Sequence, residues 1–570
     1  MNDLRRTLLW SVLAVSLLML WDGWLRHTGQ PSLFAPAPVA SAPASSASTP
    51  DAAVPQASTQ LGQGASGAAQ GAAAVSAAAG ASAPAVAQSE KVTITTDVVQ
   101  ATLDTLGGSL VHVELLKHQD QDNRSRNVVV LDQSAAHTYV AQSGLVGASS
   151  ADAALPTHKT AFTVVTPDRT LADGSQQLAV RLESEAVNGV KVVKTYVFKR
   201  GDYAIDVKQE VVNTGTATVH PQLYVQLLRD GTPPKAPEGP AFLGGPVAYT
   251  GMAIYSQKGK YQKVPFEKIN ENKAEFEKHD DNGYVAMVQH HFASAWLQND
   301  KVQREFFAQK LGNNLYATGM LFPLGDIAAG QSKAFTTQLF VGPQEEFKLE
   351  KLAPGLELVK DYGWTTIMAK PLFWLLNKLH ELLGNWGWAI VALVVLLKAA
   401  FYWLNASAYR SMAKMKALNP RIQAMREANK DDPQKMQQEM LKIYREEKVN
   451  PIGGCLPILI QIPVFIALYS VLSSSVEIRN APWVGWITDL SVKDPFFVLP
   501  ALMTASTLLQ TWLNPTPPDP VQAKMMWIMP LLFSVMFFFF PAGLVLYWLT
   551  NNLLSIAQQW MINKQIGVQN

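Results

Sequence analysis

The spacing of apolar residues changes several times along the chain, and each change predicts a different kind of element. Within residues 91–352 the apolar positions recur every second residue, as in QQLAVRLES and TYVFKRGDYAIDVKQEVV, and Val, Thr and Tyr are frequent. Turn sequences such as Gly107-Gly108 and Asn213-Thr214-Gly215 separate the runs. This period and these turns predict an antiparallel β-sandwich for residues 91–352.

Long apolar runs replace this alternation after residue 384. Residues 385–404 form the first run, which is long enough to cross a bilayer. Four more spans are predicted within 451–570, at residues 452–473, 496–513, 525–540 and 543–562. The turn Pro541-Ala542-Gly543 is so short that the last two spans must form an antiparallel hairpin.

An apolar run also lies near the N-terminus, in residues 1–27. Arg5 and Arg6 precede Leu8–Trp21, which suits either an uncleaved anchor or a cleavable signal peptide. Asp22-Gly23-Trp24 follows in place of a small-x-small cleavage site, so we favour an anchor with its basic end in the cytoplasm. With this anchor the chain has six predicted spans.

Residues 28–90 are almost free of charge and consist mainly of Ala, Ser, Pro, Gly and Gln. A segment of this composition cannot bury enough apolar surface to fold, and it predicts a flexible linker. The following sandwich should then lie outside the cytoplasm, on the far side of the anchor.

Residues 353–384 predict a helix in the plane of the bilayer interface. In PLFWLLNKLHELLGN the leucines recur at helical spacing, while Asn377, Lys378, His380 and Glu381 occupy the other face. A helix packed against the sandwich is the alternative. Gly384-Asn385-Trp386-Gly387 then turns the chain into the span.

Residues 405–450 form a polar segment with ten Lys or Arg and six acidic residues, as expected of a short cytoplasmic loop. Helical spacing predicts a hairpin of two helices, and Asp432-Pro433 supplies an N-cap and an N1 proline for the second. The methionines of the hairpin are either its core or an adaptable surface for partners: Met412, Met415, Met425, Met436 and Met440.

Composition agrees with a large membrane portion. Charged residues make up 16% of the 570 residues and hydrophobic residues 48%. The net charge of +2 gives no general attraction for nucleic acid. The single cysteine, Cys455, excludes a disulfide framework within the chain.

His290-His291 would point to opposite faces of a strand, so we expect no metal site there.

Lys398 is the one residue in these runs whose presence needs a chemical explanation, because a charge inside a bilayer is costly. It lies ~18 Å along a helix from Trp386 and ~10 Å before Asn405, in the cytoplasmic half of the span. One interpretation is that it snorkels to the cytoplasmic headgroups. The other is a water-filled cavity that receives a polar or acidic segment.

The other spans favour the cavity. They contain no Asp, Glu, Arg, Lys or His between their flanks, but they do carry amides and hydroxyls, among them Gln461, Gln510, Asn551, Asn552 and Ser555. Taken singly, each amide is more simply interpreted as a link between helices. An intramembrane protease or a proton-coupled transporter would need acids, histidines or a metal motif. No G-x-x-x-x-G-K-[ST] nucleotide motif is present.

Two long segments resemble the YidC/Oxa/Alb family of membrane protein insertases. YRSMAKMKALNPRIQAMREANKDDPQKMQQEMLKIYREEKVNPIGGCLPILIQIPVFIALYSVL is similar to the family's core, and FPAGLVLYWLTNNLLSIAQQ is similar to its last span. DYGW, PLF and GNWGW resemble its interfacial helix. The anchor and large β-domain resemble the Gram-negative members, whose periplasmic domain is a β-supersandwich.

The resemblance implies a multi-pass protein of the cell inner membrane, with both termini cytoplasmic and the β-domain periplasmic. It implies an insertase and chaperone for nascent membrane proteins, without catalytic residues, cofactor or metal. Such a protein works alone or with the Sec translocon (SecYEG and SecDF), and the ribosome is a further candidate partner. A scaffold of the translocon that acts through its β-domain is the alternative.

The resemblance also implies a five-helix core with a groove open to cytoplasm and lipid. Lys398 matches the family's positive groove residue, which is usually arginine. Matching groove positions are Gln510, Trp548 and Gln461. Substrates should contact the third and fifth spans, at Pro463, Phe465, Phe533 and Phe537, and the hairpin that holds the five methionines should meet the nascent chain.

Overall fold

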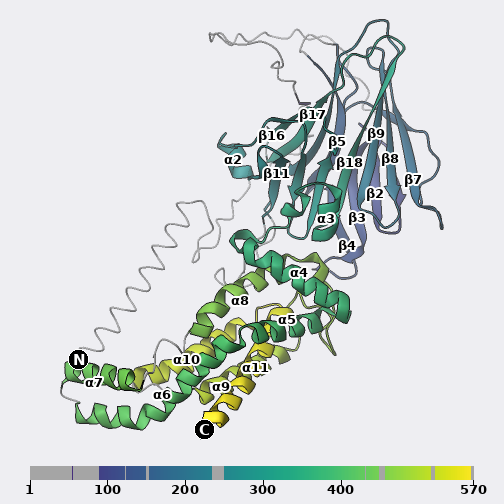
Figure 1. Cartoon of the computed structure of the whole chain (residues 1–570). Coiled ribbons are helices and arrows are strands. Elements are labelled where there is room, and N and C mark those ends of the chain that lie inside the picture. The colour runs from purple at the N-terminus through teal and green to yellow at the C-terminus, as the bar shows by residue number, and fades with distance from the viewer. Residues whose placement is uncertain are drawn as a thin grey trace, which may run out of the picture. The chain divides into compact units, whose positions relative to one another are not determined.

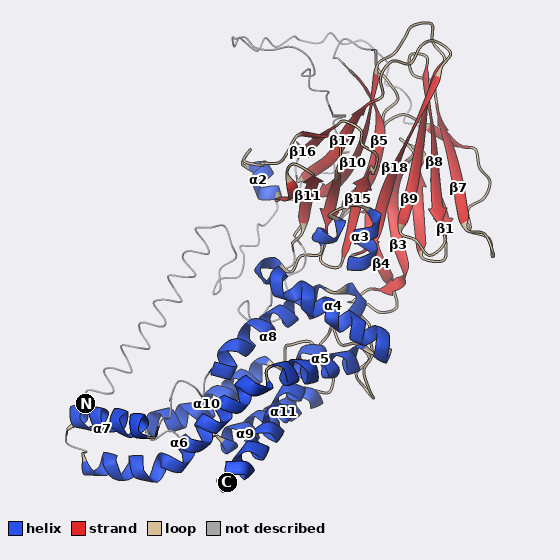
Figure 2. Cartoon of the chain, in the orientation of Figure 1, coloured by secondary structure: helices blue, strands red, loops and turns tan. Residues whose placement is uncertain are grey.

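The computed structural model describes residues 54–55, 89–121, 123–148, 153–233, 249–312, 314–429, 432–447, 456–514 and 520–566. These residues divide into two compact units, one that ends at Lys360 and one that begins at Asp361 (Figure 1). Strands make up most of the first unit and helices most of the second (Figure 2). The predicted anchor, residues 1–27, lies outside the described residues, as does almost all of the predicted linker, residues 28–90.

The first unit is a sandwich of two antiparallel nine-stranded sheets, which confirms the predicted fold of this region. One sheet has the order β1-β2-β3-β4-β5-β10-β17-β16-β13 and the other β12-β11-β14-β15-β18-β9-β8-β7-β6. The strands are β1 Lys91–Thr95, β2 Val99–Asp104, β3 Ser109–Gln119, β4 Asn127–Gln133, β5 Thr138–Gly147, β6 Phe162–Val164, β7 Gln177–Ser184, β8 Val190–Lys199, β9 Ala204–Asn213, β10 Pro221–Asp230, β11 Gly251–Ser256, β12 Lys260–Val264, β13 His279–Asp280, β14 Tyr284–Val288, β15 Phe292–Leu297, β16 Arg304–Gly312, β17 Leu315–Pro323 and β18 Ser332–Pro343.

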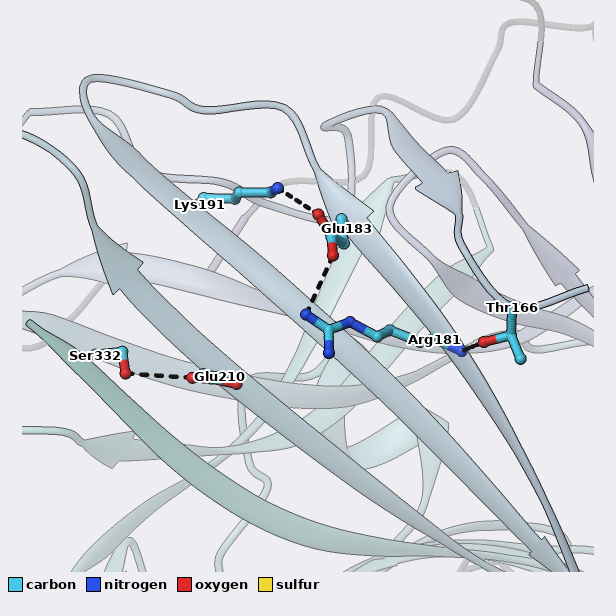
Figure 3. Close-up of polar contacts among 6 residues, drawn as sticks. All are labelled: Thr166, Arg181, Glu183, Lys191, Glu210 and Ser332. Atoms are coloured by element: carbon cyan, nitrogen blue, oxygen red, sulfur yellow. Dashed lines mark hydrogen bonds and ion pairs between the residues drawn. The ribbon is translucent and has the colours of Figure 1, made fainter.

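Strand β7 shows how the alternating pattern builds this sandwich. Its Leu178, Val180 and Leu182 are buried, while the residues between them are exposed or half-buried. The second face carries a row of charges in which Glu183 pairs with both Arg181 and Lys191 (Figure 3). Exposed pairs of this kind each contribute at most ~1 kcal/mol. The buried apolar face therefore supplies most of the stability.

Short helices cover a part of the second sheet where alternation fails. Every residue of β14 and β15 is buried, so both faces of these strands are covered. The Tyr284 hydroxyl in β14 donates to the carbonyl of Gly355 at 2.7 Å. Gly355 precedes the 3-10 helix η2 (Leu356–Val359), which follows α3 (Glu346–Leu352). It has φ 78°, and a Cβ there would lie 2.4 Å from the ring of Tyr255, so glycine is required.

The histidine pair His290-His291 differs from the prediction. It occupies the turn between β14 and β15, and its rings stack at 3.9 Å with an interplanar angle of 19°. The expectation that the two rings point to opposite faces of a strand was therefore wrong, because that rule holds only within the pleated strand. Among the described residues, no group of three or more His, Cys, Asp or Glu is placed to hold a metal.

The second unit is helical. Its helices are α4 Thr366–Leu383, α5 Trp386–Ala400, α6 Tyr402–Ala428, α7 Pro433–Glu446, α8 Leu456–Ser474, α9 Val498–Leu513, α10 Pro520–Met536 and α11 Ala542–Ile566, with short 3-10 turns η3 Gly363–Thr365 and η5 Val476–Ile478. Helix α11 contacts α5, α6, α8 and α9, and α10 packs on α9. Helix α11 is therefore the packing partner that α5, α6, α8 and α9 have in common.

The corner between α4 and α5 forms where the sequence predicts a turn. Gly384 ends α4 in the left-handed conformation at φ 67°, which glycine adopts without strain. Asn385 caps α5, and its side chain accepts a hydrogen bond from the backbone N–H of Trp388 at 3.1 Å. A Cβ on Gly387 would lie 2.2 Å from the ring of Trp483, so this glycine permits close packing against the loop after α8.

Helix α5 ends earlier than the predicted span of residues 385–404. The chain bends by 69° between Trp386–Ala400 and Tyr402–Met415. No single described helix has both the length and the hydropathy of a membrane span, whereas this bent pair has them jointly. Backbone hydrogen bonds continue through the bend, from the N–H of Phe401 to Leu397 and from the N–H of Asn405 to Phe401, each at 3.0 Å. The bend therefore leaves few backbone groups unsatisfied.

Helices α6 and α7 form the predicted hairpin. Asp432 caps α7 by accepting from the N–H groups of Gln434 and Lys435, both at 3.1 Å. Arg421 in α6 reaches Glu446 and Glu447 at the end of α7, at 3.1 and 2.8 Å. The capping prediction is thus confirmed.

Strand β8 places a lysine side chain inside the sandwich. Lys194 in β8 is 1% exposed, and its Nζ donates to the carbonyls of Gly107 at 2.6 Å and Ser143 at 2.9 Å. The ring of Phe162 lies 5.0 Å from the same atom. Burial lowers the pKa of Lys194 from 10.5 to about 7.

This burial predicts a pH-dependent stability. Between pH 7 and 10.5 the unfolded chain holds a proton on Lys194 that the folded chain lacks, so stability should rise with pH across that window. We expect the free energy of opening at β8 to increase by about 1 kcal/mol per pH unit above pH 7. Hydrogen exchange of peptides from β8 in the full-length protein, corrected for intrinsic rates, measures this slope. Lys194→Met should abolish it, and an unchanged slope in that variant would refute the assignment.

Candidate functional site

Helix α11 carries two polar stripes, and each faces different neighbours. Asn552 donates to Ser506 at 3.2 Å and to Thr507 at 2.9 Å in α9, and Gln559 donates to Asn514 Oδ1 at 3.1 Å. These contacts tie α11 to α9 and its end, as interhelical links do in an apolar surrounding. The second stripe, Asn551, Ser555 and Gln558, lies toward α5 and α6.

Lys398 meets this second stripe. It lies in the last turn of α5, where a positive charge interacts favourably with the helix dipole. Its Nζ donates to Ser555 Oγ at 2.7 Å, and Ser555 in turn donates to the carbonyl of Asn551 at 2.7 Å. Lys398 forms no ion pair with any described residue. The ammonium is therefore held by a neutral hydroxyl, and its charge is not cancelled.

Two cavities adjoin this contact. The smaller, of about 40 Å³, is lined by Lys398, Phe401 and Tyr547, among other residues. The larger, of about 240 Å³, is lined by Gln510, Trp548 and Ser555, with further hydroxyls and amides from α9 and α11. Gln461 and Asn551 line both. The four predicted groove residues, Lys398, Gln461, Gln510 and Trp548, thus lie around two adjoining cavities.

Side chains of the site that the sequence did not single out come mainly from α11. Asn551 and Ser555 stand among the polar residues of the last predicted span, without an assigned contact. Their spacing of four residues, together with Trp548 three residues earlier, places all three on one face of a helix. The sequence could therefore have identified this face of the helix. It could not have shown which neighbouring helix the face contacts.

The predicted substrate-contact residues separate into two pairs. The rings of Phe465 in α8 and Phe537 after α10 pack against Trp548, with centroids 4.9 and 5.5 Å away. Pro463 and Phe533 are exposed, Phe533 by 52%. The first pair therefore lies beside the larger cavity, and the second lies on the outer surface of the helices.

The five methionines of the hairpin are all half-buried. Met412 packs against a small cluster of Ala406, Tyr409 and Ile562, and it also lines the larger cavity. Two isoleucines of the hairpin, Ile422 in α6 and Ile443 in α7, are buried, at 0% and 5% exposure. Met415, Met425, Met436 and Met440 each keep part of their surface accessible.

Comparisons with known proteins cover nearly the whole chain. The family model described as the YidC periplasmic domain matches residues 91–375, and the model described as 60Kd inner membrane protein matches residues 378–569. The proteins named membrane protein insertase YidC from Cupriavidus metallidurans and Ralstonia nicotianae are 54% and 52% identical over 565 residues, with 99% of this chain and 98% of each relative covered.

Solved structures give a weaker likeness. A crystal structure titled as an active YidC insertase with its first transmembrane domain resolved is 20% identical and has a TM-score of 0.38, covering 82% of this chain and 91% of that one. A galactose mutarotase related enzyme from Lactobacillus acidophilus is 10% identical with a TM-score of 0.27, over 44% of this chain and 97% of that one. On the family models and the close relatives, the chain belongs to the YidC family of membrane protein insertases.

Proposed function

We propose that this protein inserts, folds and helps to assemble proteins of the inner membrane, and that the cavities beside Lys398 receive their polar segments in transit. The observation that carries the proposal is the Lys398–Ser555 contact, a cation that keeps its full charge among neutral polar side chains. Buried cations in membrane segments normally pair with acids or face water and substrate. Membership of the insertase family agrees with this function.

The outer surface of the helices supports contact with lipid. Exposed side chains of α10 are almost all large and apolar, among them Trp527, Ile528 and Leu532. Helix α4 likewise exposes Ile367 and Leu382, at 89% and 79%, while it buries Phe373. We infer that α4 lies in the interface and that α10 faces the acyl chains.

We propose six spans, with both termini and the α6–α7 hairpin in the cytoplasm and the β-domain in the periplasm. The positive-inside rule supports this orientation, because the hairpin segment holds ten Lys or Arg against six acids. The 69° bend at Phe401 supports it too, since it redirects α6 out of the axis of α5 just beyond Lys398.

The proposed mechanism begins at the hairpin, whose methionines offer an adaptable apolar surface to a nascent chain. The polar tail of the substrate then enters the hydrated cavities, drawn by Lys398. Water and amides within the cytoplasmic half shorten the apolar distance that the tail must cross. The substrate's apolar helix leaves past the third and fifth spans, α8 and α10, into lipid, and its burial there provides the driving force.

Partners follow from this mechanism. The protein would act alone on small substrates and beside the Sec translocon, SecYEG with SecDF, on larger ones, and the ribosome would deliver nascent chains to the hairpin. It needs no cofactor, metal or catalytic group, since transfer into lipid is the driving step.

Changing the charge of Lys398 should alter which tails are accepted. We expect Lys398→Arg to insert single-span substrates with acidic or neutral tails at rates within about twofold of the parent protein, because the charge is kept. Lys398→Glu should slow the acidic-tailed substrate at least about tenfold more than the neutral one, which corresponds to ~1.4 kcal/mol of added repulsion. Protease protection in proteoliposomes, with two substrates that differ only in the tail, measures both rates. Equal rates for both tails in the Glu variant would exclude an electrostatic role.

Deletion of the β-domain should distinguish an insertase from a scaffold that acts through this domain. The described first unit runs from the start of β1 at Lys91 to Lys360, so a deletion of residues 91–360 leaves no unpaired strand behind. We expect the shortened protein in liposomes to insert a small single-span substrate at a rate within about threefold of the full chain. Complete loss of insertion, with the helices still folded by circular dichroism, would instead favour a scaffold that acts through its β-domain.

A further inference from the structure

We infer that Ser555 is the positioning residue of Lys398: it holds the ammonium toward α11, where the two cavities adjoin, and away from the cytoplasmic headgroups. The inference rests on the proposed function, in which Lys398 meets polar segments of a substrate. It adds a second residue to that role and gives a physical reason why the charge faces the cavity.

The geometry makes Ser555 a fixed acceptor. A serine hydroxyl has one proton to donate and two lone pairs that accept. The proton of Ser555 goes to the carbonyl of Asn551, one turn earlier in α11, at 2.7 Å. The lone pairs therefore face Lys398 Nζ, also at 2.7 Å, and the hydroxyl of Tyr409. Because the hydroxyl is already engaged with the helix backbone, it holds the ammonium in one direction.

The ammonium of Lys398 needs a partner to fix its direction, because lysine carries a point charge on a flexible four-carbon stem. Lys398 lies two residues before the end of α5, and its neighbours Ala399 and Ala400 are exposed. Without a partner, such a side chain would extend along the helix toward the nearest headgroups. Ser555 lines the larger cavity, so a bond to it turns the ammonium across the bundle toward α11.

The neutrality of the partner is equally important. An aspartate at position 555 would orient Lys398 as well, but it would cancel the charge that attracts a substrate. The serine occupies one of the three N–H donors, and Ser555 is the one acceptor that the ammonium has among the described residues. The remaining donors and the full positive charge stay available to an entering carboxylate or carbonyl.

Stability of the helix does not require this serine. Ser555 is 2% exposed, and alanine would fit the same space with a higher helix propensity. Bonds from serine to the carbonyl one turn earlier slightly destabilise helices. Ser555→Ala should thus leave the fold intact while it removes the contacts with Lys398 and with the Tyr409 hydroxyl, and the labelling of Lys398 reports on the first of them.

Helix α10 offers a matched control. Ser534 is 3% exposed and donates to the carbonyl of Pro530, four residues earlier, at 2.7 Å. It therefore repeats the burial and backbone bond of Ser555, and no lysine contacts it in the described structure. Ser534→Ala removes the same atoms from the same kind of site without touching Lys398.

Insertion selectivity is the first measurement. In proteoliposomes, the full-length Ser555→Ala protein should lower the ratio of acidic-tail to neutral-tail insertion by about three- to tenfold. Ser534→Ala should leave that ratio unchanged, and Ser555→Thr should retain it, because the hydroxyl is kept. Adding Ser555→Ala to Lys398→Gln should have no further effect on the ratio, since the residue acts only through the lysine.

Chemical labelling of Lys398 is the second measurement, and it does not depend on insertion. A membrane-impermeant amine acylating reagent is applied to the face that bears the hairpin, and the Lys398 peptide is read by mass spectrometry against the exposed Lys442. We expect labelling of Lys398 to rise at least threefold in Ser555→Ala and to stay unchanged in Ser534→Ala. If Ser555→Ala does not accumulate, the isosteric pair Ser555→Thr and Ser555→Val provides the same comparison.

The outcomes separate the two proposals. If Lys398→Gln lowers the insertion ratio while Ser555→Ala changes neither the ratio nor the labelling, the positioning role is overturned and the proposed function stands. If Lys398→Gln leaves the ratio unchanged, the proposed function of Lys398 fails, and labelling alone decides whether Ser555 positions it. A raised labelling in Ser555→Ala then supports the positioning role, and unchanged labelling refutes it.

Discussion

The helical unit depends on the rule that a polar group among apolar helices must find a hydrogen-bond partner. Lys398 and the amides of the last helix would each cost several kilocalories per mole if they were buried alone. Helix α11 meets this constraint from one central position, since it contacts α5, α6, α8 and α9. Asn552 and Gln559 bond to α9 and its end, Gln558 reaches the carbonyl of Tyr402 at 3.3 Å, and Ser555 accepts from Lys398. The same helix thereby holds the bundle together and places the charge.

The two stripes of α11 divide these tasks, and the division explains how a cavity persists beside a well-packed interface. Toward α9, Asn552 donates to the hydroxyls of both Ser506 and Thr507, which ties the two helices together. Toward α5, Ser555 accepts a hydrogen bond from Lys398, and Gln461 and Asn551 line both cavities. Aromatic packing of Phe465 and Phe537 on Trp548 lies next to the larger cavity and supplies apolar bulk there. Polar and apolar surfaces thus adjoin within a few ångströms, as a protein that handles segments of both kinds requires.

Sequence patterns predicted the parts of this structure that local physics decides. Period-two alternation gave the sandwich, apolar run lengths gave the helices, and Gly384, Asn385 and Asp432 marked helix ends that the structure confirms. The prediction for His290-His291 was wrong because a turn lay where a strand was assumed. The bend at Phe401 was missed because its hydrophobicity matches that of the run on either side. Which helix an amide bonds to depends on neighbours that are distant in sequence, so no local pattern could show that Asn552 bonds to α9.

The bend also changes how Lys398 should be understood. In a straight span that ends at residue 404, six residues of apolar helix would lie beyond the lysine, and snorkelling would be a matter of stem length. In the bent chain it lies two residues from the end of α5, just before the bend. The ammonium turns toward α11 there and bonds to Ser555. A hydrogen bond to a neutral hydroxyl is individually modest, about 1.5–3 kcal/mol when one partner is charged. This free energy is enough to favour the direction toward α11 over extension toward the headgroups. The charge of Lys398 therefore faces the cavity.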